Sequence, residues 1–384
     1  MTRILYFTRD YTTHDHRFLA ALAKTNYEVY YLRLERRGHS LEERPVPAGI
    51  KKVPWKGGSS PARAWDGLHL LADLKRVIRL VKPDIIQAGP LQTCAFLVAL
   101  AGFHPLVSMS WGYDLLGNAV CSKPATAAHR LLCEVANRYT LRCLVWNWIT
   151  RFTLRRSAVM VGDCSTIRQK AIALGMNKER IVTFPWGIDL NHFIPPKIER
   201  PGDGKFTLLS TRSWEPIYGV DVLAQSFIQA AQHHPELHLI MLGDGSQAES
   251  LRQMFNQGGV LERVVFPGQV TQSLLPGFYQ KVDLYISASH SDGTSISLLE
   301  AMACGCPVLV SDIPGNCEWV TPGTNGWLFP DGDADALAQA ILTSIEQRQA
   351  LPEMGRTARG VAEKRADWQM NFPQLFKAYA LAKT

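Results

Sequence analysis

The sequence predicts an α/β protein made of two Rossmann-like domains, each built on a parallel sheet. Its 384 residues suit two domains of ordinary size. Short apolar runs alternate with segments of helical spacing along the chain, which is the pattern of successive βα units. The charge also divides near residue 190. Residues 1–190 carry 27 Lys and Arg against 14 Asp and Glu, a net +13, whereas residues 191–384 carry 14 against 20, a net −6.

These observations predict three parts of the chain. We expect an N-terminal domain over residues 1–190, a C-terminal domain over 191–366, and a C-terminal helix over 367–384 that packs back on the first domain. Residues 185–200, with the pair Pro195-Pro196, are the expected linker. Ligands of such sheets bind at the carboxyl ends of the strands, and we expect two facing domains to place them in a cleft.

The first half contains five apolar runs that predict strands, at residues 3–8, 29–33, 84–87, 106–110 and 158–161. Helical spacing over 15–24 and 70–80 predicts two helices. Residues 85–113 hold no charged side chain, but their longest apolar run, 94–103, is much shorter than the ~20 residues that cross a membrane. We expect a strand, a buried helix and a strand there.

The second half repeats the same alternation. Strands are expected at residues 206–210, 237–242, 264–266, 284–287 and 307–311. Helices are expected at 220–231, 247–256, 297–303 and 334–347.

Composition excludes several classes of protein. Apolar residues make up 46% and charged residues 20%, as in a globular enzyme and not a disordered chain. No basic run is interleaved with aromatic residues, so we expect no nucleic-acid partner. The eight cysteines form no CxxC pair and have no histidine at zinc spacing, which is typical of buried thiols in a reducing compartment. The first residues do not form a signal peptide, so we expect a cytoplasmic protein.

The loop after the strand at 284–287 is the most informative segment. Gly293 would let a ligand approach the backbone, and the helix that follows directs unpaired N–H groups at the loop, which suits a diphosphate. Asp292 precedes the glycine, and Glu300 lies about one turn into the helix, where a carboxylate could accept hydrogen bonds from ribose hydroxyls. Ser297 and Glu300 also match a capping box, so a purely structural role for Glu300 stays open.

Several motifs occur in a fixed order around this loop. Residues 287–303 read SASHSDGTSISLLEAMA, residues 242–245 read LGDG, residues 208–219 read LLSTRSWEPIYG, and residues 181–193 read IVTFPWGIDLNHF. The set resembles the E-x7-E signature and accompanying elements of glycosyltransferase family 4, retaining enzymes with the GT-B fold. The likeness extends from about residue 159 to 345 and is thin before that, where residues 110–114 read SWGYD.

The resemblance implies roles for individual residues. Arg212 would hold the donor diphosphate, and Asp292 would act with it as a catalytic residue. Glu300 would bind the ribose. The remaining donor-binding residues would be Gly293, Thr294 and Ser295 against the sugar and phosphates, Tyr218 near the leaving group, and Gly268 and Val270 beside the base.

This sequence departs from the family pattern at four places. Tyr218 replaces the usual lysine, Asp292 is one methylene shorter than the usual glutamate, and Trp111 stands where a histidine is common. The usual glycine-rich loop after the first strand is replaced by TRDYTTHDH at residues 8–16. These departures indicate altered specificity or lost activity.

The predicted function is transfer of a sugar from a nucleotide-diphosphate sugar to an acceptor hydroxyl with retention, in cell-surface polysaccharide or glycolipid synthesis. The wider family favours a UDP-sugar as donor. No acidic pair stands in a suitable loop, so we expect no metal and no other cofactor. Two alternatives stay open: a non-catalytic nucleotide-sugar-binding partner of another glycosyltransferase, and a nucleotide-sugar 2-epimerase.

The acceptor, a saccharide or a lipid-linked sugar, should contact the basic first half. The candidates are His16, Arg17 and Trp111; the alternative for the first two is a helix start capped by Asp15. His14 and His16 lack a third ligand for a metal. Arginines and two tryptophans gather over residues 130–156, which suggests peripheral contact with an anionic membrane at the inner face of the cell membrane. Arg138 and Arg142 share one helix face and Arg151 and Arg155 nearly the opposite one, so a single straight helix would not present one basic stripe.

Overall fold

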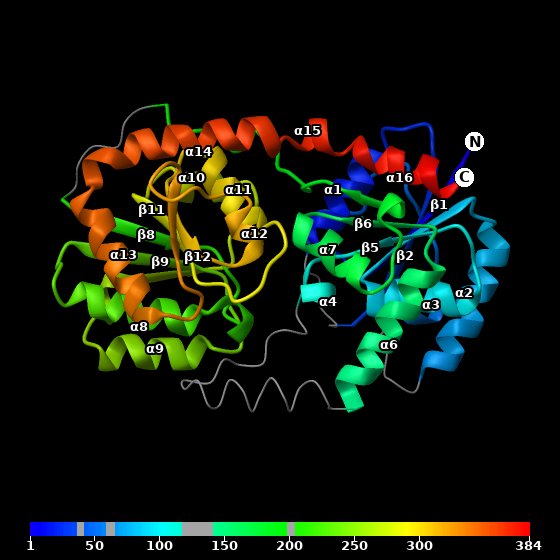
Figure 1. Ribbon diagram of the computed structural model, residues 1–384, viewed down its shortest axis with the longest axis horizontal. Helices are drawn as coiled ribbons and strands as arrows, with labels where there is room; N and C mark the ends of the chain where they lie inside the picture. Colours follow the sequence, from blue (N-terminus) through cyan, green and yellow to red (C-terminus); the bar gives the residue numbers. More distant parts are fainter. Residues whose placement is uncertain (37–41, 59–65, 117–140, 198–203) are drawn as a thin grey trace. The chain divides into compact units, whose positions relative to one another are not determined.

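The computed structural model describes residues 1–36, 42–58, 66–116, 141–197 and 204–384 (Figure 1). The chain forms two units. Unit 1 comprises the described residues up to Phe184 together with Phe372–Thr384, and unit 2 comprises Pro185–Asn371. The C-terminal segment expected at 367–384 is therefore divided between the two units.

Unit 1 is built on a seven-stranded sheet in the order β3-β2-β1-β4-β5-β6-β7, and every neighbouring pair is parallel. Its strands are β1 (Arg3–Arg9), β2 (Glu28–Leu34), β3 (Lys51–Lys52), β4 (Ile85–Gly89), β5 (Leu106–Met109), β6 (Val159–Gly162) and β7 (Ile181–Thr183). Its helices are α1 (Thr13–Leu22), α2 (Gly67–Val81), α3 (Phe96–Ala101), α4 (Tyr113–Leu116), α6 (Leu141–Arg156), α7 (Ser165–Ala173) and α16 (Gln374–Ala382).

The segment without charges, 85–113, forms β4, α3 and β5, as the sequence predicts. Ile85, Ile86 and Val98 are fully buried, because this segment lies in the middle of unit 1. None of the helices in the described ranges is both long and apolar enough to cross a membrane. The C-terminal helix α16 packs on β6 and β7, and the hydroxyl of Tyr379 bonds the side chain of Gln87 in β4.

Unit 2 is built on a six-stranded parallel sheet in the order β10-β9-β8-β11-β12-β13. Its strands are β8 (Phe206–Ser210), β9 (Leu237–Leu242), β10 (Val264–Gly268), β11 (Leu284–Ser287), β12 (Val308–Ser311) and β13 (Gly326–Phe329). Its helices are α8 (Val220–Ala231), α9 (Ala248–Gln257), α10 (Leu275–Tyr279), α11 (Ile296–Ala303), α12 (Pro314–Cys317), α13 (Ala334–Glu346), α14 (Leu351–Arg365) and α15 (Trp368–Asn371).

Two adjacent strands of unit 2 determine where its site lies. β8 and β11 are paired in parallel, so the residues that follow Ser210 and Ser287 leave the sheet at the same edge. Eight residues, 288–295, separate the end of β11 from the start of helix α11. The loops that carry Arg212 and Asp292 therefore meet.

Candidate donor site

Arg212 lies where the loops after β8 and β11 meet. Its Nη2 donates to Asp292 Oδ2 at 2.8 Å, and its Nη1 donates to the hydroxyls of Ser295 and Ser297 at 3.0 and 2.9 Å. The side chain of Arg212 is 11% exposed and that of Asp292 is 22% exposed. The planar guanidinium thus joins the end of one strand to the first turn of α11.

Tyr218 covers one face of this guanidinium. The ring centroid lies 4.1 Å from the central carbon of Arg212, a cation–π distance. Burial by itself would lower the pKa of Arg212, but the charge of Asp292 raises it above its ordinary value, so Arg212 is a permanent cation. Its Nε atom is buried and has no hydrogen-bond partner within the described residues. Where the family has a second cation, this chain has an aromatic ring.

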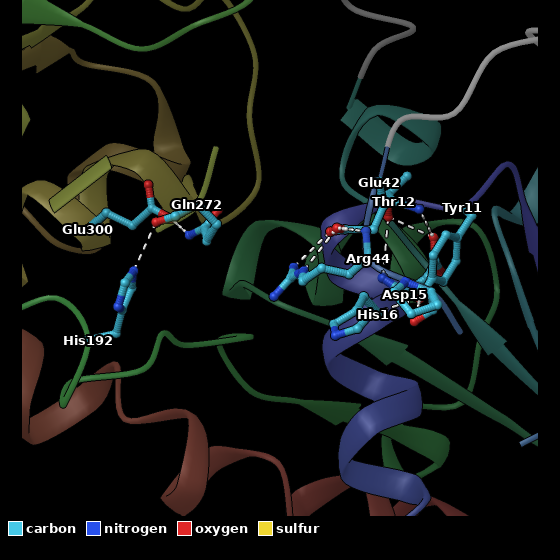
Figure 2. A network of polar contacts seen from close by, with 10 residues as sticks. Tyr11, Thr12, Asp15, His16, Glu42, Arg44, His192, Gln272 and Glu300 are labelled. Carbon is cyan, nitrogen blue, oxygen red and sulfur yellow. Dashed lines mark hydrogen bonds and ion pairs between the residues drawn. The ribbon is translucent and has the colours of Figure 1, made fainter. Parts of the chain in front are cut away.

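Glu300 lies in α11, three residues after Ser297, but it does not cap the helix. The N-cap is Ser295, two residues before Ser297, and it makes no side-chain capping bond. The capping-box interpretation of Ser297 and Glu300 is therefore wrong. The Glu300 side chain is buried, with the residue only 4% exposed. Its Oε1 accepts from Gln272 Nε2 at 2.9 Å (Figure 2). Its Oε2 accepts from the Tyr279 hydroxyl at 3.0 Å.

The Tyr279 hydroxyl also connects the two parts of the site. It lies 3.2 Å from the hydroxyl of Thr211, the neighbour of Arg212, and 3.0 Å from Glu300 Oε2. Burial raises the pKa of Tyr279 well above its usual value, so the hydroxyl keeps its proton. Arg212, Asp292, Ser295 and Tyr218 are thus in direct contact, and Glu300 is joined to them through Tyr279.

Close backbone packing shapes the loop around Gly293. Thr294 and Ser295 are buried, at 4% and 5% exposure. A Cβ atom on Gly315, in α12, would lie 2.0 Å from the carbonyl oxygen of Gly293. A Cβ atom on Gly219 would lie 2.0 Å from the carbonyl of Ala288, and Gly219 also has φ +58°. Only glycine at 219 and 315 lets the neighbouring chain come this close.

The residues predicted beside the base lie at the end of β10. Gly268 has φ +80°, and its carbonyl accepts from the backbone N–H of Gly243 at 2.8 Å. Val270 is half-buried against the apolar cluster that contains Leu242 and Leu298. Gln272, two residues further on, contacts Glu300 directly. No sequence pattern pointed to Gln272, because a polar residue in a loop has no periodic signal.

In unit 1 the polar residues after β1 mainly build the start of α1. Thr12 is the N-cap, and it forms a capping box with Asp15. The Asp15 carboxylate accepts from Thr12 N at 2.9 Å, from Thr12 Oγ1 at 2.6 Å and from the Tyr6 hydroxyl at 3.0 Å. The expectation that Asp15 itself caps the helix is therefore wrong by three residues. Burial raises the pKa of Asp15 to about 6.

The acceptor candidates of unit 1 separate into two places. His16 Nδ1 lies 2.8 Å from the Tyr11 hydroxyl, and burial lowers the pKa of His16 (Figure 2). Trp111 packs near His14, with ring centroids 5.7 Å apart, and its backbone N–H donates to Asp114 at 3.2 Å. Arg17 is half-buried on α1.

His14 is the most perturbed histidine of this region. Burial lowers its pKa to about 3, so the ring is neutral near pH 7. Its Nδ1 atom is buried, with no hydrogen-bond partner in the described part of the chain. Across the residues that the structure describes, no three His, Cys, Asp or Glu side chains come together as a metal site would require.

A pair that the sequence did not suggest lies beside His16. Arg44 donates through Nε and Nη2 to the two carboxylate oxygens of Glu42, at 2.9 and 2.7 Å (Figure 2). Burial opposes ionisation of Glu42, but its bonds to Arg44 lower its pKa to about 2. The pair lies in the segment whose Pro45 carbonyl accepts a hydrogen bond from the Tyr11 hydroxyl at 3.3 Å.

Comparison with known proteins agrees with this architecture. The model for glycosyl transferases group 1 matches residues 194–361, and the model for glycosyltransferase family 4 matches residues 12–192. A solved structure of HepE from Anabaena in complex with UDP and glucose has a TM-score of 0.74 and 19% identity, covering 99% of this chain and 100% of that one. Sucrose-phosphate synthase from Thermosynechococcus elongatus has a TM-score of 0.77 and 17% identity, over 99% of this chain and 98% of the other.

Curated relatives match over part of their length. The phosphatidyl-myo-inositol mannosyltransferase of Mycobacterium leprae is 30% identical over 206 residues, which is 53% of this chain and 54% of that protein. The glycogen synthase of Mycobacterium tuberculosis is 25% identical over 304 residues, 79% of this chain and 70% of that protein. The chain spans about half the length of the first of these relatives.

The two parallel sheets and the structural likenesses define a protein with the GT-B fold. With both family models matched in order along the sequence, the chain belongs to the family 4 type of glycosyltransferases.

Proposed function

We propose that this chain is a retaining glycosyltransferase that moves a sugar from a nucleotide-diphosphate sugar to an acceptor hydroxyl, in the synthesis of a cell-surface polysaccharide or glycolipid. One observation carries the proposal. Arg212, a permanent cation, is held at the first turn of α11, and Glu300 is held four residues beyond Ile296 on the same helix. A phosphate-binding group beside the first turn of a helix and a ribose-binding group on that helix are what a nucleotide diphosphate requires.

The chemical difficulty of the reaction is charge. As the bond from the anomeric carbon to the diphosphate oxygen breaks, negative charge grows on the leaving group. Arg212 and the N-terminus of α11 supply preorganised positive charge for those oxygens. In front-face transfer the leaving phosphate takes the proton of the acceptor hydroxyl as the new bond forms, so the step needs no separate base. Asp292 would orient Arg212 and lie against the sugar.

UDP is the nucleotide we favour. The support is a relative and a structural neighbour: GtfA of Streptococcus gordonii is named for UDP-N-acetylglucosamine, and HepE was solved with UDP. Another relative is named as GDP-mannose-dependent, so a screen must include both nucleotides. Transfer without metal is also proposed, since Arg212 would carry the charge that a metal carries elsewhere.

The acceptor would bind to unit 1, with His16, Arg17 and Trp111 as candidates. We also propose that the protein is cytoplasmic and touches the inner face of the cell membrane through α6. Among the side chains of α6 that the structure describes, three apolar ones are exposed, Leu144 at 54%, Val145 at 46% and Trp148 at 57%. Arg151 and Arg155 continue the face of Leu144 and Trp148 at helical spacing, and both are exposed. Arg130 and Arg138 lie outside the described residues.

The membrane proposal has its own test. Flotation with vesicles containing phosphatidylglycerol should recover the protein, while vesicles of phosphatidylcholine alone should recover much less. Replacing Trp148 with Ala, or Arg151 and Arg155 with Gln, should weaken recovery. Absence of binding to anionic vesicles would contradict the proposal.

A turnover screen tests the enzymatic proposal. Purified protein is incubated with UDP-glucose, UDP-N-acetylglucosamine, GDP-mannose and related donors, with simple sugars and lipid-linked sugars as acceptors. Transfer with retained anomeric configuration is the expected result. The presence of Tyr218 in place of a cation favours a second candidate, a non-catalytic nucleotide-sugar-binding partner, and binding without turnover would support it. Isomerisation of the donor without acceptor would indicate a 2-epimerase.

A further inference from the structure

The surroundings of Glu300 contain a residue that the resemblance assigned no role. Glu300 receives one hydrogen bond from Tyr279, which is 1% exposed and belongs to the core of unit 2. It receives another from Gln272, which is half-buried in the loop after β10. The first donor is fixed by packing in the core, and the second is a half-buried loop side chain.

His192, in the segment before β8, holds the loop that carries Gln272. Nε2 of His192 lies 2.9 Å from the carbonyl oxygen of Gln272 (Figure 2). A carbonyl only accepts, so the histidine donates its Nε2 proton. The ring of His192 packs edge-on against Phe193, with centroids 4.9 Å apart. The backbone of Gln272 is therefore fixed before any ligand arrives.

The amide of Gln272 retains hydrogen-bonding capacity. One of its N–H groups is used by Glu300, and within the described ranges Oε1 and the other N–H have no partner. A ribose offers two hydroxyls, each of which donates and accepts, whereas an ionised carboxylate only accepts. An amide beside the carboxylate supplies both a second acceptor and a donor.

We propose that Gln272 contacts a ribose hydroxyl of the donor beside Glu300 and makes this site selective for ribonucleotides. The inference rests on the proposed donor site. In the opposite arrangement, Gln272 would merely occupy the place of a ribose hydroxyl on Glu300 until the donor displaced it. These two arrangements predict opposite effects when the amide is removed.

Calorimetric titration distinguishes them. Wild type, Gln272→Ala and Gln272→Glu are titrated with UDP, 2′-deoxy-UDP and 3′-deoxy-UDP, or with the guanosine series if wild type prefers GDP. Gln272→Ala should bind the ribonucleotide about fivefold to tenfold more weakly, the value of one hydrogen bond, and should lose much of its preference over one deoxy analogue. Gln272→Glu should bind more weakly still, because it places a second carboxylate beside Glu300. Ser273→Ala, in the same loop, is the matched control and should bind as wild type does.

The possible results distinguish a failure of the proposed role of Gln272 from a failure of the proposed donor site. If wild type binds neither UDP nor GDP, the proposed donor site fails. If wild type binds and Glu300→Gln weakens binding, but Gln272→Ala binds equally well, more tightly, or with both ribose preferences intact, the role of Gln272 is overturned and the donor site stands. Thermal unfolding without nucleotide checks that each variant is folded.

Discussion

The two units differ in how far apart in the sequence the partners of their charged and polar side chains lie. In unit 2, Arg212, Asp292, Ser295 and Ser297 bond to one another across two strand ends that are distant in sequence. In unit 1, the polar residues after β1 bond mainly to residues a few positions away, as Thr12 does to Asp15 and Tyr11 does to His16. Contacts between distant segments build a site, whereas contacts within one turn first build the helix start. The donor side is therefore better defined than the acceptor side.

The largest expected effect is on Arg212. Arg212→Ala removes the cation at the first turn of α11, and we expect kcat/KM to fall about 100-fold to 1000-fold, as when a preorganised donor for a developing charge is lost. Arg348→Ala is the matched control, because Arg348 also forms an ion pair in unit 2, with Asp283 at 3.2 Å, away from the site. Steady-state kinetics with the best donor from the screen provides the comparison, and similar losses in both variants would remove the special role of Arg212.

Packing around the Gly293 loop should be nearly as sensitive. Gly315→Ala would place a Cβ atom 2.0 Å from the Gly293 carbonyl, so the backbone must shift. We expect the free energy of unfolding to fall by about 2–4 kcal/mol, measured by urea denaturation. In Gly360→Ala the new Cβ meets nothing within 4 Å, and the helix α14 should be unchanged or slightly stabilised. A neutral Gly315→Ala would mean that the loop tolerates displacement.

In unit 1 the sharpest effect is on pH dependence. His14 has a folded pKa of about 3, below its ordinary 6.5, so the unfolded chain binds a proton that the folded chain does not. The stability that His14 contributes is complete above pH 6.5 and is lost as the pH falls toward 3. His14→Gln should therefore gain about 2 kcal/mol relative to wild type between pH 7.5 and pH 5, since each pH unit below 6.5 is worth about 1.4 kcal/mol. Parallel stability curves for the two proteins would contradict burial of a neutral ring.

Asp15 should produce the opposite trend. Its folded pKa of about 6 lies above the ordinary 3.8, so the folded chain keeps a proton that the unfolded chain has lost. The stability contributed by protonated Asp15 is present below pH 3.8 and is lost as the pH rises through 6. Asp15→Asn removes this slope, so between pH 3.8 and 6 its stability should rise with pH relative to wild type. His14 and Asp15 contribute opposite slopes in this range, so a double variant with His14→Gln should keep nearly the wild-type pH dependence, which urea denaturation at several pH values can measure.

The smallest effect is expected at Tyr218. Tyr218→Lys returns a second cation to the site, and we expect UDP to bind about fivefold more tightly while UMP changes less, because the added charge meets the outer phosphate. Tyr218→Met removes the ring without adding charge and serves as the control. Equal tightening for UDP and UMP, or for both variants, would show that charge at this position is unimportant.

The sequence predicted the central strands closely, and the reason is physical. β8, β9 and β11 lie in the interior of the sheet, so most of their residues are apolar and buried. The edge strands β3, β7 and β13 were missed. β3 is the exposed pair Lys51–Lys52, β7 has only three residues, and the middle of β13 is only half-buried. Helix α14 was missed because it contains Pro352 and Gly355, and Gly355 is needed there since its Cβ would lie 2.0 Å from the carbonyl of Gly305.

The site was predictable to a similar extent. Arg212, Asp292 and Glu300 follow from the order of motifs, because strand ends that are neighbours in a parallel sheet bring their loops together. Tyr279 and Gln272 could not be predicted, because their roles depend on the position of α10 and of the loop after β10 relative to α11. In unit 1, His16 and Trp111 stay predictions for the acceptor, since His16 bonds to Tyr11 and Trp111 packs near His14, both in the same unit.

Calorimetric titration of UDP and GDP into wild type and Glu300→Gln tests the donor site most directly. The amide keeps the size of the side chain and removes its charge, while Glu353→Gln, at an exposed ion pair with Arg356 on α14, removes the same charge elsewhere in unit 2. We expect wild type and Glu353→Gln to bind the preferred nucleotide equally and Glu300→Gln to bind it at least about tenfold more weakly. Equal affinity for all three proteins would contradict the assignment of the nucleotide to this site.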